Sequence, residues 1–185
     1  MSVDGGFSVI ILNTHITKGS EMLNIFTQIT EELHQLIKDD PVRPEIPLEH
    51  RVNDFSKIYM LKEEDGKPTA VVCVKFLPNI PETVDELFMT ANGASTAVFY
   101  TIWSYAAGAG KRLLEEATKS IKETNPEVDT FVTLSPKTEM ARRFHHKNGA
   151  TTYRENVDTV NYLYQKGRGS DAGLDKILDH DKINH

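Results

Sequence analysis

The sequence predicts an α/β (α+β mixed sheet) fold, in which a central mixed sheet is flanked by helices. Strand-like and helix-like segments follow one another in the order β-α-β-β-(α)-β-α-β-α-β-β, which favours a layered sheet over a helical bundle or a sandwich. The chain has 185 residues, 39% of them hydrophobic and 26% charged, as expected for one globular domain. We assign this domain to residues 1–166 and expect residues 167–185, a polar tail containing glycine, to be loosely ordered.

The N-terminal part predicts one strand, one helix and a loop. Residues 7–16 form a β-branched run typical of a strand. Residues 19–39 predict a helix that begins at Ser20 as its N-cap, because apolar residues recur there at helical spacing: Met22, Ile25, Ile29, Leu33 and Leu36. Three prolines within residues 41–47 exclude a helix or a central strand. We expect this loop to line a substrate cleft.

A β-hairpin is predicted for residues 56–77. Two alternating apolar runs are separated there by Asp65-Gly66, a dipeptide that favours tight turns. The segment that follows predicts a short helix starting near Glu82. The hairpin would give the sheet a pair of adjacent antiparallel strands.

The second half of the chain alternates strands and helices. An apolar strand over residues 95–105 runs directly into a helix over residues 106–123, which Asn125-Pro126 ends. The remaining predicted elements are a strand over 128–134, a helix over 137–148 and two short strands over 150–155 and 159–165.

Composition and charge exclude several classes of function. A net charge of -6 and a pI near 5.6 argue against a nucleic acid partner, because phosphate backbones are bound by basic surfaces. The only cysteine, Cys73, lies in an apolar run, where we expect a buried small hydrophobe in a reducing compartment. Without a membrane-spanning run or a signal-peptide pattern, we expect a cytoplasmic protein with no membrane partner. The histidines lack ligand spacing, so we expect no metal.

A glycine-containing loop joins the strand at 95–105 to the following helix. Glycines permit close approach to the backbone, and the first N–H groups of a helix lack internal partners, so together they form an anion site. The alternative is a glycine turn that makes room for the helix to pack on the strand. The residues assigned to cofactor binding are Ala106, Ala107, Gly108, Ala109, Gly110, Lys111 and Arg112, the last two for outer phosphates.

Two motifs resemble those of the GNAT acyltransferase superfamily. Gly108-x-Gly110, after the fourth main strand, is similar to the pyrophosphate loop [QR]-x-x-G-x-[GA], although Tyr105 replaces the Gln or Arg. The string "EMARRFHHKNGA" resembles the ending A-x-x-x-Y-x-x-x-G-F, with His145 in place of the tyrosine. The resemblance implies a GNAT-like acyl-CoA-binding fold, with a small-molecule coenzyme A thioester as substrate and no metal.

Four short strings resemble the catalytic domain of malonyl-CoA decarboxylase, a family of GNAT fold. They are "AVFYTI", "TLSP", "FHHKNGA" and "VNYLY", and the likeness covers Lys67 to Tyr164. It matches Ser135, His145 and Tyr162 to family residues, of which the serine and histidine are regarded as catalytic. Family members have a separate helical N-terminal domain and a long insertion between these two residues, which here are ten positions apart.

The resemblance favours decarboxylation of malonyl-CoA, or a related malonyl thioester, to acetyl-CoA. Ser135 would bind the substrate carboxylate or thioester oxygen, and His145, with an unperturbed pKa near neutrality, would orient the carboxylate or deliver a proton. Tyr162 would position either group. We expect the adjacent His146 to be solvated, because it faces another side of the helix.

Other functions stay open at this point. Acetyl transfer to an amine or a carrier protein would use the same loop and His145. A non-catalytic coenzyme A-binding domain is a third interpretation, and a homodimer is not excluded. The structural alternative is that Ser135-Pro136 starts a helix and that His145 is a packed or exposed helix residue.

Overall fold

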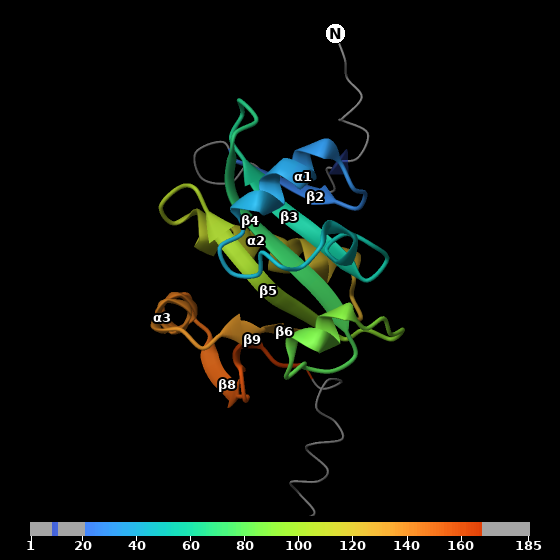
Figure 1. Ribbon diagram of the computed structural model, residues 1–185, viewed down its shortest axis with the longest axis vertical. Helices are drawn as coiled ribbons and strands as arrows, with labels where there is room; N and C mark the ends of the chain where they lie inside the picture. The colour runs from blue at the N-terminus through green and yellow to red at the C-terminus, as the bar shows by residue number, and fades with distance from the viewer. Residues whose placement is uncertain (1–8, 11–20, 168–185) are drawn as a thin grey trace, which may run out of the picture.

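The computed structural model describes residues 9–10 and 21–167, and it confirms the predicted class: a mixed sheet flanked by helices (Figure 1). The strand order is β1-β2-β3-β4-β5-β6-β9-β7, with β8 paired to β9. Pairing is antiparallel except between β5 and β6, which are parallel. The strands are β1 Val9–Ile10, β2 Met22–Phe26, β3 Ser56–Lys62, β4 Pro68–Leu77, β5 Thr96–Ser104, β6 Thr130–Thr133, β7 Ser135–Pro136, β8 Thr151–Glu155 and β9 Thr159–Gln165. The helices are α1 Glu31–Leu36, α2 Ala109–Thr124 and α3 Glu139–Lys147, with 3₁₀ turns η2 Ile37–Asp39, η3 Leu48–His50 and η4 Val84–Phe88.

The predicted helix over residues 19–39 is wrong in its first half. Strand β2 occupies that half and pairs antiparallel with β3. Its apolar residues are buried on both faces of the sheet, since Leu23 packs on one face and Phe26 on the other. Helix α1 begins only after Thr30, whose hydroxyl accepts a hydrogen bond from the Leu33 N–H at 3.1 Å. Ser20, most of the strand expected over 7–16 and the tail at 168–185 lie outside the described residues.

The remaining predicted elements are confirmed to within a few residues. The turn between β3 and β4 contains Gly66 at φ 89°, a left-handed conformation that glycine adopts readily. The short helix expected near Glu82 is the 3₁₀ turn η4, which the Thr83 and Glu86 side chains cap reciprocally. Cys73 is fully buried, as predicted.

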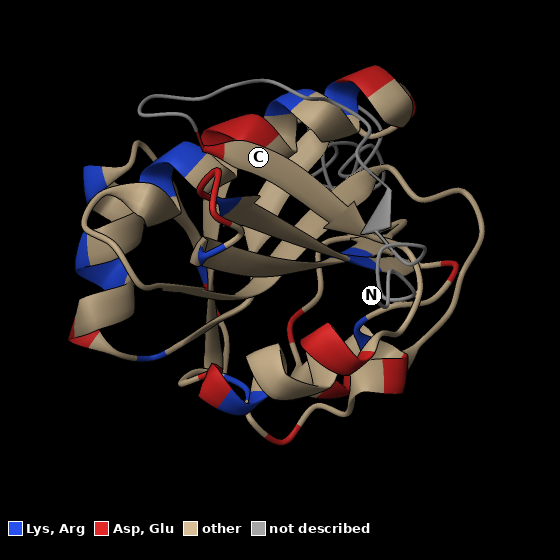
Figure 2. Cartoon of the chain, turned by 90° about the horizontal axis from the view of Figure 1, so that it is seen from above, with Lys and Arg blue, Asp and Glu red and all other residues tan. Residues whose placement is uncertain are grey.

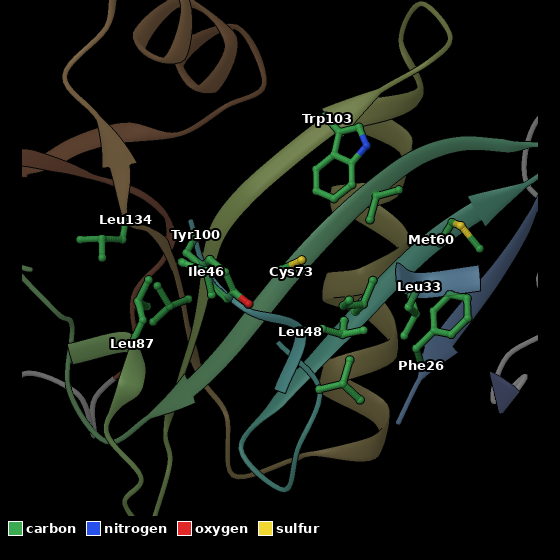
Figure 3. Packing of buried hydrophobic residues seen from close by; sticks show 14 of the residues in the cluster. Phe26, Leu33, Ile46, Leu48, Met60, Cys73, Leu87, Tyr100, Trp103 and Leu134 are labelled. Atoms are coloured by element: carbon green, nitrogen blue, oxygen red, sulfur yellow. The ribbon is translucent and has the colours of Figure 1, made fainter. Parts of the chain in front are cut away.

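Each face of the sheet carries its own core. Helix α2 packs on one face and α1 lies on the opposite one (Figure 1). The cluster on the α1 side continues from Phe26 and Leu33 across β3 and β4 to Trp103 and Leu134 (Figure 3). Both faces of the central strands are therefore buried, which fixes the position of β5 firmly.

The sheet divides beyond the first half of β5. Strands β5 and β6 pair only from Thr96 to Phe99 of β5, and the last contact is the Leu134 N–H donating to the Phe99 carbonyl at 3.2 Å. A register shift opposite β4 gives β5 an extra residue at Tyr100. The chain then turns to β7, which pairs with β9 instead. The space between the second half of β5 and the β7–α3 segment is called the wedge below.

No helix among the described residues is both long enough and apolar enough to cross a membrane.

Candidate active site

A cavity of about 330 Å³ fills the wedge. One wall is β5 from Phe99 to Ser104, and the loop residues Pro41 and Val42 contribute to the lining, as does Gly110 of α2. The opposite wall is formed by β7 and α3, through Ser135, Pro136, Thr138, Met140, Ala141, Phe144 and His145. Two of the predicted catalytic residues, Ser135 and His145, thus line the same cavity. The proline loop lines it too, as its sequence led us to expect.

Ser135 is held at the cavity wall by a chain of hydrogen bonds. Its side chain is 4% exposed, and its Oγ donates to Thr133 Oγ1 at 2.8 Å. The same Thr133 oxygen accepts the Tyr162 backbone N–H at 3.0 Å. Because a hydroxyl hydrogen rotates freely, Thr133 can instead donate to Ser135 when the serine turns its own hydrogen toward a ligand. Ser135 begins no helix, since α3 starts after Thr138, whose hydroxyl is the N-cap acceptor.

His145 is buried and oriented by two tyrosines of β9. Its ring is stacked on Tyr162 with centroids 5.2 Å apart, and its Nδ1 lies 2.7 Å from the Tyr164 hydroxyl. Desolvation, with a smaller contribution from His146, lowers the pKa of His145 to about 4. The imidazole is therefore neutral at pH 7, because the fold lowers its pKa below the unperturbed value. His146 is exposed, as predicted, and its Nε2 lies 2.8 Å from Thr152 Oγ1.

From the sequence alone Tyr164 could belong to the core or to the site, and the structure places its hydroxyl beside His145. Burial raises the pKa of its phenol well above the ordinary value, so the hydroxyl keeps its proton. It can donate that proton to His145 Nδ1, and the other ring nitrogen then carries the imidazole hydrogen. The signal was present in the strand spacing, because Tyr162 and Tyr164 are two positions apart and share one face of β9.

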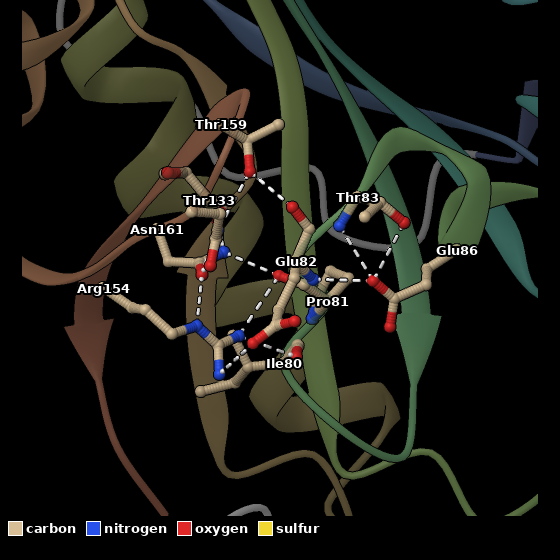
Figure 4. A network of polar contacts seen from close by, with 10 residues as sticks. Ile80, Pro81, Glu82, Thr83, Glu86, Thr133, Arg154, Thr159 and Asn161 are labelled. Carbon is tan, nitrogen blue, oxygen red and sulfur yellow. Dashed lines mark hydrogen bonds and ion pairs between the residues drawn. The ribbon is translucent and has the colours of Figure 1, made fainter.

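A polar network ties β9 to the rest of the fold behind this wall (Figure 4). The buried Asn161 side chain donates to the carbonyls of Pro81 and Thr133, each at 2.9 Å. Arg154 donates to the Ile80 carbonyl at 3.1 Å and forms an ion pair with Glu82 at 3.3 Å. These contacts fix β9, and hence both tyrosines, relative to the end of β6.

The glycine loop confirms the packing interpretation, while its use as an anion site stays a prediction. Gly108 begins α2 at φ 75°, the left-handed conformation that favours glycine. Gly110 makes room for α3, because a Cβ there would lie 3.1 Å from the Phe144 ring. The start of α2 thus lies beside α3 and at the edge of the cavity.

Cationic side chains surround this helix start unevenly. Lys111 is exposed, with Glu115 at 3.9 Å, whereas Arg112 Nε is engaged by the buried Glu21 at 2.6 Å. Figure 2 shows Lys and Arg near the start of α2 and along the adjacent α3. The α3 cations are Arg142, Arg143 and Lys147, two of which pair with Glu139. The region is suited to an anion through backbone donors and nearby positive charge.

Tyr105, which departs from the glycine-loop motif, has a structural role. Its hydroxyl donates to Asp39 at 2.7 Å and accepts from the Trp103 indole N–H at 2.9 Å. Desolvation, together with the hydrogen bond to Asp39, raises the pKa of Tyr105 to about 12, while the hydrogen bond from Trp103 acts in the opposite direction. The residue therefore joins the end of β5 to the segment after α1.

Solved structures with this fold include bacterial malonyl-CoA decarboxylases. The proteins from Agrobacterium vitis and Rhodopseudomonas palustris superpose with TM-scores of 0.67 and 0.64 at 18% and 19% identity. The alignments cover 86% and 89% of this chain but 64% of each of theirs. The Campylobacter jejuni N-acetyltransferase PseH, solved with acetyl coenzyme A, gives a TM-score of 0.52 at 16% identity, covering 80% of this chain and 99% of PseH.

These likenesses show that the chain has a GNAT-like fold, as the sequence motifs predicted. No protein-family model matches the sequence, and no curated protein matches it either.

Proposed function

We propose that the protein is an acyl-CoA enzyme that decarboxylates malonyl-CoA, or a related malonyl thioester, to the acetyl thioester. The observation that carries this proposal is the pair Ser135 and His145, both buried and both lining one cavity that opens beside the start of α2. The likeness of fold to malonyl-CoA decarboxylases supports it.

Coenzyme A would bind with its pyrophosphate at the start of α2. The backbone N–H groups after Gly108 and the helix dipole supply the anion site, with Lys111 as an exposed cation nearby. The pantetheine arm would enter the wedge, where β5 has backbone groups that β6 does not pair. This arrangement brings the thioester between β5 and the Ser135 wall.

The reaction needs three things from the wedge. The carboxylate must be held so that the bond to CO₂ breaks into the thioester carbonyl, the enolate oxygen needs donors, and the enolate carbon must gain one proton. Ser135 Oγ–H would donate to the carboxylate or the thioester oxygen. His145, neutral and backed by Tyr164, would donate its ring N–H as a hydrogen bond to the developing enolate, or would pass to the carbon a proton taken from water, so that the ring ends the step neutral. Tyr162 would hold the ring in place by stacking.

Acetyl transfer to an amine or a carrier protein is the second candidate. It is favoured by one observation: the alignment spans 99% of the N-acetyltransferase PseH, whereas it covers 64% of the decarboxylase chains. A transferase would use His145 as a base toward the acceptor, a role that a neutral imidazole can fill at pH 7.

Incubating the purified protein with malonyl-CoA alone separates the candidates. A decarboxylase releases acetyl-CoA and carbon dioxide without any acceptor, and Ser135→Ala abolishes this release. A transferase leaves malonyl-CoA unchanged, and it consumes separately supplied acetyl-CoA only when an amine or carrier-protein acceptor is also present. Coenzyme A that binds in calorimetry while every acyl-CoA remains intact would instead indicate the non-catalytic binding domain.

A further inference from the structure

Arg43 is a buried arginine with hydrogen-bond donors left over. Its side chain is 8% exposed, and its Nη2 donates to the Leu134 carbonyl at 3.2 Å. Its Nε is buried and has no acceptor among the residues that the structure describes. A buried guanidinium normally has all its nitrogens paired, because desolvating an unpaired donor on a charged group is costly.

Arg43 lies next to the inner end of the wedge, although it is not itself among the residues that line the cavity. The N–H of Leu134 makes the last backbone hydrogen bond between β5 and the second half of the sheet. The carbonyl of Leu134 accepts the hydrogen bond from Arg43 Nη2. The residues next to both partners, Val42 and Ser135, line the cavity. Figure 3 shows Ile46 of the same loop beside Tyr100 of β5, in the cluster that includes Leu134.

The neighbouring arginine, Arg51, shows what a fully paired guanidinium looks like in this loop. Its three nitrogens donate to the Ile46 carbonyl at 2.8 Å, to Asp40 at 2.7 Å and to the Arg43 carbonyl at 2.6 Å. Arg51 thereby fixes the backbone that carries Arg43. Its own charge is matched by Asp40, whereas Arg43 has no ion pair with a described residue within 4.0 Å.

The charges at the inner end of the wedge do not balance. Two buried arginines, Arg43 and Arg51, lie near one buried carboxylate, Asp40. Both Asp40 oxygens are taken, by Arg51, by Thr101 and by the N–H groups of Val42 and Arg43. Glu45 attracts Arg43 but is exposed, and desolvation still lowers the pKa of Arg43 below the ordinary value. One positive charge is therefore left for an additional anion.

We propose that Arg43 binds the free carboxylate of the acyl group, and so selects acyl-CoA molecules that carry one, such as malonyl-CoA, over neutral ones. This inference rests on the proposed use of the wedge by an acyl-CoA. The planar guanidinium suits a carboxylate because adjacent N–H groups can contact both oxygens. A short acyl chain reaching Arg43 would pass Ser135, which is one residue beyond Leu134.

Arg43 would act on binding more than on the chemical step. The carboxylate leaves as neutral CO₂, so its attraction to Arg43 is strongest in the bound substrate and weakens as the bond breaks. Removing such a ground-state interaction raises KM more than it lowers kcat. Arg43 is thus a specificity-determining residue, separate from the proton-handling role of His145.

The test compares malonyl-CoA with its neutral isostere acetoacetyl-CoA by calorimetry. Binding is measured in the Ser135→Ala protein, where bound malonyl-CoA stays intact, with and without Arg43→Met, Arg43→Lys or the matched charge-loss control Lys67→Met in the exposed β3–β4 turn. We expect a preference for malonyl-CoA that falls roughly 10- to 100-fold with Arg43→Met. We also expect Arg43→Lys to keep part of the preference, and free coenzyme A to bind all variants equally.

The outcomes separate this inference from the proposed reaction. Equal affinity for the two ligands before Arg43 is changed, or a preference that survives both Arg43→Lys and Arg43→Met, overturns the carboxylate site even if the Ser135-containing protein decarboxylates malonyl-CoA. An Arg43-dependent preference in a protein that never decarboxylates malonyl-CoA supports the site and rejects the reaction. If Arg43→Met fails to fold, Arg43→Lys decides: an unchanged preference together with an unchanged KM contradicts the role of the planar guanidinium.

Discussion

Two sets of buried polar side chains near the wedge, one in the segment after α1 and one on the β7–α3 side, differ in how completely their polar atoms are paired. On the loop side, both oxygens of Asp40 and all three nitrogens of Arg51 have partners. On the β7–α3 side, Ser135 and His145 each have one side-chain hydrogen bond and line the cavity with the rest of their polar surface. Complete pairing is typical of a group that stabilises the fold, whereas partial pairing next to a cavity supports the proposal that Ser135 and His145 bind a ligand.

Breaking the fully paired group should have the largest effect, on stability. Arg51→Met leaves Asp40 buried without its ion pair, so we expect the free energy of unfolding to fall by about 3–5 kcal/mol. Denaturant titration measures this change. Lys62→Met, which removes the more exposed Lys62–Glu32 pair, serves as the control and should cost less than about 1 kcal/mol. Equal losses of unfolding free energy in the two variants would contradict the view that the buried Arg51–Asp40 pair matters more for stability than the more exposed Lys62–Glu32 pair.

Breaking the partly paired group should instead affect activity. Ser135→Ala removes the hydroxyl that we propose as a donor to the substrate, and we expect kcat/KM for malonyl-CoA to fall roughly 100- to 1,000-fold with little change in stability. The matched control is Ser120→Ala in α2, a buried serine whose hydroxyl has no partner among the described residues. A Ser135→Ala protein that decarboxylates at the parent rate would assign the serine a structural role.

The lowered pKa of His145 predicts that the free energy of unfolding depends on pH. Because the folded pKa is about 4 and the unfolded value about 6.5, the unfolded chain binds the proton first as pH falls. The contribution to stability is complete above about pH 6.5 and is lost progressively toward pH 4, reaching about 2 kcal/mol of loss at pH 5. Denaturant titrations at pH 7.5 and pH 5 should show this loss, and His145→Gln should lack it. An identical pH dependence in both proteins would show that His145 is not buried as a neutral ring.

Removing the tyrosine behind the histidine should have the smallest effect. Tyr164→Phe deletes the hydroxyl 2.7 Å from Nδ1 and keeps the ring. We expect kcat/KM to fall about tenfold, the equivalent of one hydrogen bond, with the pH profile of kcat displaced because the ring loses its fixed tautomer. Tyr153→Phe, on the neighbouring β8, is the control. A pH profile of Tyr164→Phe that matches the parent would limit Tyr164 to packing.

The order of elements could be predicted from sequence because most of them have one clear periodicity. Helix α2 and the β3–β4 hairpin lie where the patterns placed them. Residues 22–26 were wrongly predicted as helix because their apolar side chains fit both a helix and a strand buried on two faces. Pairing with β3 along its full length decided between them, and that long-range contact leaves no local signal.

The candidate site was predicted only in part, for a similar reason. Ser135 and His145 stand in recognisable strings, and β7 and α3 bring them to one cavity. The pKa of His145 and the leftover donors of Arg43 depend on burial, which arises from elements distant in sequence. The local sequence gives no signal that separates Arg43, whose Nε lacks an acceptor among the described residues, from Arg51, whose three nitrogens are all paired.

The most direct test of the account is a double-mutant cycle on Ser135 and His145, measured as kcat/KM for malonyl-CoA without an acceptor. If the two side chains act on one substrate in one cavity, Ser135→Ala combined with His145→Gln should be only slightly slower than the slower single variant, because residues that act as a unit are strongly non-additive. Losses that multiply in the double variant would contradict a joint site, as would a parent protein that leaves malonyl-CoA intact.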